Sequence, residues 1–221
     1  MQRAMSVIGL FAFVAARAAA QWLGMPSWNS PKGGRGVGIA ADYGQPNADA
    51  GKGSAYGGRV SFGAGSALLT VGAASWKPEN SSARVTSFGG SLQARLIGGS
   101  LLPVAVNLQL GGAYHAKVTS GTQTLPEAST AQGAVGLSTP LPVPLIRLEP
   151  YFSPGVRYHR YWNAPAGTRK DETNLGWVLG ANAGFRAFGI HLAYDSEKFA
   201  NGTTRGVLGI GASVEISVPG L

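Results

Sequence analysis

The sequence predicts an all-β protein, an antiparallel, up-and-down transmembrane β-barrel of about ten strands. Three observations predict it. Apolar and polar residues alternate with period two through most of the 221 residues. The chain contains 34 glycines, and only 13% of its residues are charged. A typical soluble domain has about 7% glycine and about 25% charged residues. The chain contains no cysteine, which excludes disulfide scaffolds, thiolate metal sites and thiol nucleophiles.

Residues 1–20 have the three parts of a secretory signal peptide. Residues 1–3 carry a positive charge, residues 6–14 form a short apolar core, and a run of small residues ends at Ala20. Signal peptidase recognises this order. We expect cleavage after Ala20, with cleavage after Ala18 as the alternative.

Residues 21–33 contain Pro, Gly and Ser without a clear period, so we expect an irregular N-terminal segment. The period-two pattern of residues 34–221 predicts the barrel. Its clearest strand includes residues 104–114, in which Val, Leu and Tyr form one face and Asn, Gln and Gly form the other. The predicted strands lie at about 35–43, 55–64, 67–76, 84–97, 103–118, 130–139, 146–162, 174–186, 188–196 and 205–218.

The predicted connections alternate between longer and shorter ones, beginning with residues 44–54 and then residues 65–66. This is the pattern of an up-and-down sheet with long loops at one end and tight turns at the other. In a membrane barrel the tight turns face the periplasm, so we expect both termini there. A barrel of eight strands is the alternative.

Alternation by itself leaves open which face of the sheet meets water. A soluble lipocalin-like barrel holds its apolar residues inside, whereas a membrane barrel turns them outward. Here the polar face consists mostly of Gly, Ser, Ala, Asn and Gln, which suits a narrow lumen. The predicted strands also reach the ~9–11 residues that cross a bilayer at a tilt. The sequence therefore favours a membrane barrel, with a secreted soluble barrel as the alternative.

Aromatic residues gather near the ends of the predicted strands, on the apolar face. Such girdles are typical of the two membrane interfaces, because an aromatic ring is apolar while Tyr and Trp also carry a polar group. The alternative interpretation is the end of a soluble sandwich core. The predicted girdle consists of Tyr43, Tyr56, Tyr114, Tyr158, Trp177 and Tyr194 near the long loops, and Phe185 and Phe188 near the tight turns.

With its signal peptide and strands such as 150–158, 176–185 and 189–194, the chain resembles the small outer-membrane β-barrel proteins of Gram-negative bacteria, the OmpA-like and OmpX-like superfamily. The likeness is one of pattern and covers nearly the whole mature chain. It implies a location in the bacterial outer membrane, contact with lipids and lipopolysaccharide, and insertion by the barrel assembly machinery. Family members usually end on an aromatic residue, whereas this chain ends on Leu221.

Charged residues on the polar face form two predicted clusters in the lumen. Because an unpaired buried charge is costly, we expect Arg–carboxylate pairing across the lumen. Such pairs would act either as a salt-bridge plug or as a gate or weakly anion-selective constriction. The cluster near the tight turns comprises Arg95, Arg147, Glu149, Arg186 and Glu215, and the upper one comprises Asp42, His115, Lys117, Arg157, His159 and Asp195.

The sequence predicts no catalytic residues, no cofactor and no metal site. HExxH and CxxC motifs are absent, and His115, His159 and His191 are expected to be polar filler of the lumen. The glycine pairs at 36–38 and 209–211 lie inside predicted strands and open no helix, so they do not predict a nucleotide site.

The net charge of +8 is spread along the chain, which argues against nucleic-acid binding. The predicted function is that of a non-enzymatic outer-membrane protein with a structural or loop-mediated role, whose loop partner is unknown. The alternatives are a narrow pore for small solutes and a lipid-acting outer-membrane enzyme. An enzyme would need a Ser/His or His/Asp pair at the lipid-facing rim.

Overall fold

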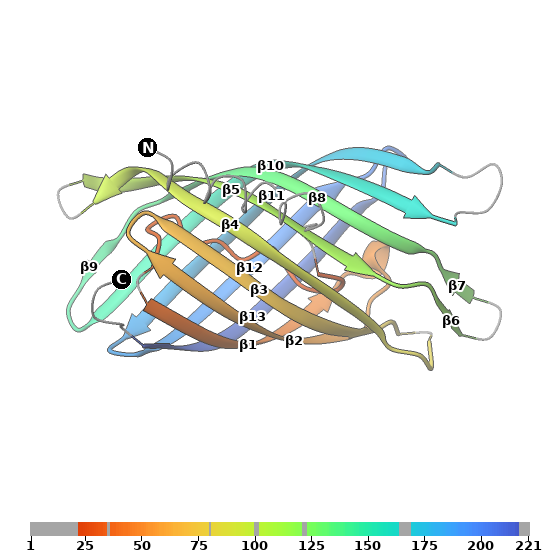
Figure 1. Ribbon diagram of the computed structural model, residues 1–221, viewed down its shortest axis with the longest axis horizontal. Helices are drawn as coiled ribbons and strands as arrows, with labels where there is room; N and C mark the ends of the chain where they lie inside the picture. Colours follow the sequence, from red (N-terminus) through yellow and green to blue (C-terminus); the bar gives the residue numbers. More distant parts are fainter. Residues whose placement is uncertain are drawn as a thin grey trace, which may run out of the picture.

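Ten long antiparallel strands form one closed barrel (Figure 1). This computed structural model describes residues 22–34, 36–79, 81–99, 102–120, 123–163 and 169–216. The predicted signal peptide, residues 1–20, and the C-terminal Leu221 lie outside the described residues.

Each strand of the wall pairs with the next one along the chain, and β1 pairs with β13 to close the ring. The predicted ten-stranded barrel is therefore confirmed, and the eight-stranded alternative is wrong. The wall strands are β1 (Gly36–Pro46), β2 (Ser54–Ala64), β3 (Ala67–Lys77), β4 (Val85–Gly99), β5 (Leu102–His115), β8 (Glu127–Ser138), β10 (Ile146–Trp162), β11 (Asp171–Phe185), β12 (Phe188–Lys198) and β13 (Thr204–Ile216).

The two ends of the barrel differ in their connections, as the alternating spacing predicts. One end has tight turns such as 65–66 and 186–187, and we call it the tight-turn end. The other end, which we call the loop end, lies at the right in Figure 1. The shorter elements are η1 (Ala48–Ala50), the hairpin of β6 (Val118–Ser120) and β7 (Gln123–Leu125), and β9 (Leu141–Val143), which pairs with the start of β10.

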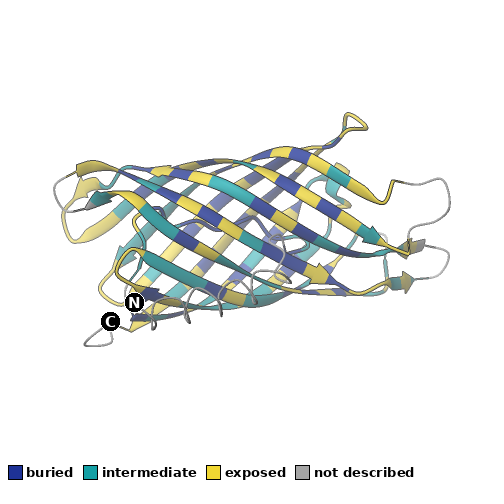
Figure 2. Cartoon of the chain, turned by 45° about the horizontal axis from the view of Figure 1, so that its top comes forward, coloured by how far each residue is buried: buried dark blue, intermediate teal, exposed yellow. Residues whose placement is uncertain are grey.

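The side chains of the wall have the opposite arrangement to those of a soluble barrel. Outward-facing Ile39 and Leu179 are 57% and 55% exposed, whereas inward-facing Asn107 and Gln109 are 1% and 2% exposed. Figure 2 shows this alternation of buried and exposed positions along the strands. A soluble lipocalin-like barrel requires the reverse arrangement. Among the described residues, no helix is long and apolar enough to cross a membrane.

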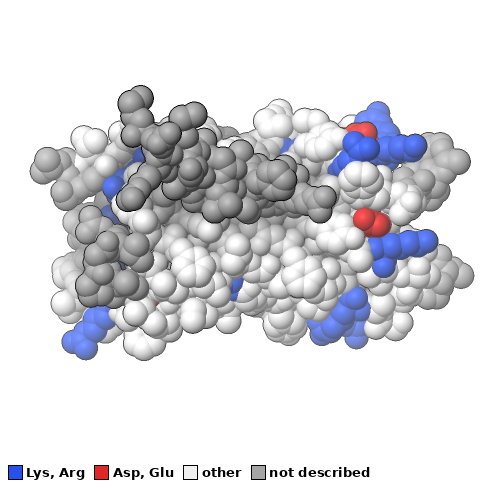
Figure 3. All heavy atoms as spheres, viewed as in Figure 1, with Lys and Arg blue, Asp and Glu red and all other residues white. Residues whose placement is uncertain are grey.

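The eight residues of the predicted girdle lie on the apolar outer face, seven of them exposed and Tyr43 half-buried against Tyr56, with ring centroids 5.4 Å apart. Trp177 and Tyr194 form a similar pair at 5.7 Å. On the face shown in Figure 3, charged side chains gather toward the two ends, and the waist between them is mostly uncharged. The outside of the barrel is thus an apolar belt that includes these aromatic residues.

Candidate functional site

The lumen of the barrel is occupied by the chain itself. Residues 22–34 have no regular secondary structure and pass through the lumen. Trp22 packs beside Gly89 of β4 in the loop-end half, and Gly33 lies near the 65–66 turn of the tight-turn end. The segment then joins β1, which runs back toward the loop end. The sequence predicts an irregular segment here but gives no sign that it lies inside the barrel.

Polar side chains of the wall hold the backbone of the segment. Gln109 Nε2 donates to the Trp28 carbonyl at 2.9 Å, and Asn182 Nδ2 donates to the Asn29 carbonyl at 3.1 Å. The Ser30 amide donates to Gln93 Oε1 at 3.0 Å. These bonds satisfy backbone groups that would otherwise be buried without partners. The Asn and Gln residues of the lumen therefore have a definite role as binding partners of the segment.

Apolar side chains of the segment form the core together with wall residues such as Trp76, Tyr151 and Val178. Met25 is fully buried, and Trp22 and Trp28 are 9% and 7% exposed. Cavities between segment and wall, such as one beside Trp28 and one beside Arg157, have volumes of about 30 and 10 Å³. A water needs about 10–15 Å³, so these cavities hold a few water molecules at most.

Inward-facing glycines make room for the segment. A side chain at Gly209 of β13 would lie 2.5 Å from Pro26 and 3.0 Å from Trp28. The other wall glycines whose side chains would meet the segment are Gly44, Gly57, Gly89 and Gly136. The glycine on the polar face of the sequence thus reflects the path of residues 22–34 as well as the narrowness of the lumen.

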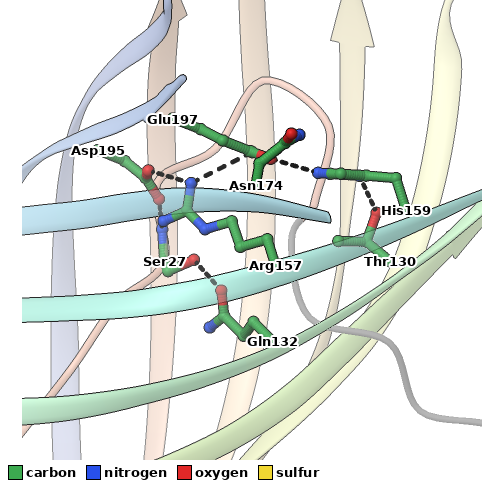
Figure 4. A network of polar contacts seen from close by, with 8 residues as sticks. All are labelled: Ser27, Thr130, Gln132, Arg157, His159, Asn174, Asp195 and Glu197. Carbon is green, nitrogen blue, oxygen red and sulfur yellow. Dashed lines mark hydrogen bonds and ion pairs between the residues drawn. The ribbon is translucent and has the colours of Figure 1, made fainter. Parts of the chain in front are cut away.

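Arg157 is the centre of a buried polar network in the loop-end half (Figure 4). Its guanidinium lies 2.7 Å from Asp195 and 3.4 Å from Glu197, both on β12. Arg157 starts from β10 and has to cross β11, which carries Gly176 at the crossing point. A Cβ there would lie 2.9 Å from the guanidinium carbon, so the absence of a side chain lets the ion pairs form.

Glu197 extends this network to His159, whose Nε2 lies 2.5 Å from the carboxylate. If Nε2 carries the proton, Nδ1 accepts from the Thr130 hydroxyl at 3.0 Å. Asn174 Nδ2 donates to the same carboxylate at 2.8 Å. Asp195 in turn accepts from the Ser27 amide at 2.8 Å. The network therefore ties the N-terminal segment to the wall.

A second cluster joins Asp42, Arg59 and His191. Arg59 Nε donates to Asp42 Oδ2 at 2.9 Å, and His191 Nε2 lies 2.5 Å from Asp42 Oδ1. Trp28 of the segment covers the group, with its ring 4.5 Å from the His191 ring and 5.0 Å from the Arg59 guanidinium. The indole thus makes edge-on and cation–π contacts with the cluster.

The tight-turn end holds a looser group. Arg147 and Glu215 are 3.8 Å apart and more than half exposed. Glu149 is buried and accepts from the Ser138 hydroxyl at 2.5 Å, while Arg95 donates to the Lys32 carbonyl at 2.9 Å. Of the predicted residues of this end, Arg147 contacts Glu215 and donates to the Arg186 carbonyl at 3.2 Å, while Glu149 and Arg95 bond to other partners.

The remaining predicted lumen residues lie apart from both clusters. Arg186 is in the β11–β12 turn, over the ring of Phe185, and Lys117 follows β5 and is exposed. His115 is buried at the end of β5, where Nδ1 lies 3.2 Å from the Ala116 carbonyl. Of the six residues of the predicted upper cluster, the structure therefore brings Arg157, His159 and Asp195 together in one network.

Sequence reasoning missed Arg59 and Glu197 as members of the upper clusters. The period-two pattern does contain a signal for Glu197. Asp195 and Glu197 are two residues apart in the same strand, so their side chains lie on the same face. The pairing of Arg59 with Asp42 depends on which strands are neighbours and on a diagonal reach between them.

Hydroxyl, imidazole and carboxylate groups in series are the components of nucleophilic catalysis. Here Thr130, His159 and Glu197 are each at most 9% exposed and face the lumen, and Glu197 is also paired with Arg157. The other two histidines, His115 and His191, are also buried, at 8% and 5% exposed. No group of three or more metal-ligating His, Asp or Glu side chains occurs in the described part of the chain.

Comparisons with known proteins return solved barrels and no family. No protein-family model and no curated protein matches the chain in sequence. The chain is similar to a bacterial polysaccharide outer membrane secretin, with 12% identity and a TM-score of 0.48 over 75% of this chain and 57% of that one.

Two further structures cover 83% of the chain. They are the β domain of the Bordetella autotransporter BrkA, with 10% identity, a TM-score of 0.48 and 100% of that domain covered, and the N-terminal β-barrel domain of Pseudomonas aeruginosa OprF, with 14% identity, a TM-score of 0.39 and 99% covered. The resemblance to outer-membrane barrels is one of fold.

Proposed function

We propose that this protein is an integral, non-catalytic β-barrel of the bacterial outer membrane that acts through its wall and its long loops. The observation that carries the proposal is the apolar belt around a closed, polar-lined barrel. A sheet can cross lipid only when every backbone group is paired within it, and closure of the ring achieves this.

The distribution of side chains supports a lipid environment. Exposed Leu, Ile, Val and Phe residues surround the wall, whereas monomeric soluble proteins rarely expose continuous apolar surface of this extent. Export through a cleaved signal peptide would bring the chain to the periplasm, where the barrel assembly machinery would insert it. Lipids and lipopolysaccharide would then contact the belt.

The loop end supports an interaction role, because its loops are hydrogen-bonded to neighbouring strand ends. Asn47 between β1 and β2 donates through Nδ2 to the Thr204 carbonyl at 2.9 Å, and the Ser82 and Ser120 hydroxyls lie 2.9 Å apart. Glu172 accepts from the Ala200 amide at 2.9 Å. Loops held in this way present a defined surface, which lowers the entropic cost of binding a partner.

The state of the ionisable groups supports the absence of catalysis. The histidines of the two upper clusters contact carboxylates that also pair with arginines. A general base must be able to reach a substrate, and residues 22–34 occupy the space beside these groups. A permanently open narrow pore is disfavoured by the same filled lumen.

Heat-modifiable migration of outer-membrane fractions on a denaturing gel tests the proposal. A folded barrel resists the detergent unboiled, and we expect it to migrate differently before and after boiling. Digestion of whole cells by an external protease should cut within the long loops and leave the wall intact. A protein that is recovered soluble from the periplasm and shows no shift would contradict the proposal.

A further inference from the structure

We propose that the barrel is a conditional pore for small hydrophilic solutes, in which residues 22–34 are a tethered plug that can leave the lumen through the tight-turn end. This inference deepens the proposed function and rests on it, because a pore requires a wall that spans the membrane. It differs from the permanently open pore, since the closed state is the one described above.

The wall is complete without the segment. Its strands pair from β1 round to β13 and back to β1. Within the described residues, the backbone–backbone bonds of the segment are two turns of its own, Met25 to Trp22 and Gly33 to Ser30. The other hydrogen bonds of its backbone come from wall side chains, apart from the Ser30 hydroxyl, which donates to the Gly33 carbonyl. The plug can therefore leave the lumen without breaking any backbone hydrogen bond between the strands of the wall.

The lumen wall is suited to water once the segment has left. The side chains that hold the segment are amides, hydroxyls and charged groups, all of which water can satisfy in its place. The apolar side chains that would be exposed are Trp22, Met25 and Trp28 of the plug and the wall residues that pack with them, among them Trp76, Tyr151 and Val178. Their transfer to water opposes opening. The closed state is thus the ground state, and the open state has a wetted passage.

The connection of the segment sets the direction of withdrawal. Between the plug and β1, at the tight-turn end, Gly33 and Gly36 have φ angles of +78° and +82°. Glycine adopts such angles without strain, so these two residues can act as hinges. Trp22, beside Gly89 of β4, is the described residue of the segment farthest along the chain from these hinges.

The charges that remain in the lumen define the solute. In the two upper clusters three carboxylates, of Asp42, Asp195 and Glu197, face two guanidinium groups, of Arg59 and Arg157. In these clusters the carboxylates therefore outnumber the guanidinium groups by one. Rings of carboxylates favour cations in narrow pores, so the open passage should prefer small cations to anions.

Conductance of full-length protein in planar bilayers tests the inference. The variant Gly209→Val places a side chain where Pro26 and Trp28 pack, and it leaves the outer face unchanged. Overpacking of this kind should raise the open fraction by about tenfold or more over the parent protein. Gly133→Val on β8 is the matched control, because a Cβ there meets only Leu110 at 3.7 Å, and it should behave like the parent.

A disulfide lock gives the opposite result in the same protein, which has no cysteine of its own. Asn29 and Ser153 are hydrogen-bonded at 2.7 Å between segment and wall. In the background of Gly209→Val, the pair Asn29→Cys and Ser153→Cys should close the pore when oxidised and reopen it on reduction. The single variant Ser153→Cys should not respond to oxidation.

The results separate this inference from the proposed function. Heat-modifiable migration reports the barrel, and conductance reports the plug. A heat-modifiable Gly209→Val protein that conducts no better than its parent would overturn the conditional pore and leave the outer-membrane barrel standing. If Gly209→Val does not fold, openings of the otherwise unchanged Asn29→Cys/Ser153→Cys protein under reducing conditions, abolished by oxidation, decide the same question. Equal conductance in both redox states would overturn it.

Discussion

The charged side chains at the two ends of the lumen differ in how far they are buried and in how many polar partners they have. At the loop end, Arg157, Asp195 and Glu197 have side chains that are at most 4% exposed, and each has several polar partners. At the tight-turn end, Arg147 and Glu215 are 64% and 57% exposed and lie 3.8 Å apart. The difference follows the plug, which seals the first group from water and leaves the second hydrated. The loss of stability on removing a charged residue should therefore depend more on its burial than on whether it is paired.

The largest expected effect is that of removing Arg157. Arg157→Met leaves two buried carboxylates without their cation and should lower the free energy of unfolding by about 3–5 kcal/mol. Urea unfolding in detergent micelles measures it. Adding Asp195→Asn and Glu197→Gln should recover much of the loss. If Arg157→Met lowers the free energy of unfolding no more than Arg147→Met does, burial does not distinguish the charges at the two ends.

A charge placed on the outer face should lower the free energy of unfolding slightly less than the loss of Arg157 does. Leu192 lies near the middle of β12 and is 48% exposed on the belt. Leu192→Arg should destabilise a lipid-inserted barrel by about 2–4 kcal/mol. Unfolding in lipid vesicles measures the change, and Asn201→Arg in the 199–203 loop is the control. If both variants unfold alike, the apolar belt does not face lipid.

The second upper cluster should show an intermediate effect. Asp42→Asn removes the charge that Arg59 and His191 share and should cost about 1.5–3 kcal/mol. Arg59 retains some exposure, at 16% of its side chain, which lets water compensate in part. Thermal unfolding compares this variant with Glu79→Gln, whose Lys52 pair is about half exposed on the loops. A larger loss for Glu79→Gln would show that burial is not the deciding factor.

The smallest effect is expected at the tight-turn end. Arg147→Ala should change stability by about 1 kcal/mol or less, because exposed ion pairs gain little and are screened by salt. Unfolding midpoints at low and high salt should agree within the same margin. A loss close to that of Arg157→Met would mean that the pair is sealed from water in the folded protein.

The sequence by itself determined the wall. Strand character is local, since successive side chains alternate between the two faces. The alternation therefore predicts ten strands, their order and their alternating connections within a few residues. The composition of the polar face also predicts which side would be outside, and the structure has the apolar residues there. Arg157, His159 and Asp195 were placed in one cluster by the same pattern.

Only the tertiary structure decided what fills the lumen. Residues 22–34 have no period, because their conformation is set by Gln93, Gln109 and other wall side chains distant in sequence. Arg59 likewise reaches Asp42 through the register of the neighbouring strands β1 and β2. A repeating pattern reports the face on which a residue lies. The partners across a closed barrel depend on which strands meet, and no local period encodes that.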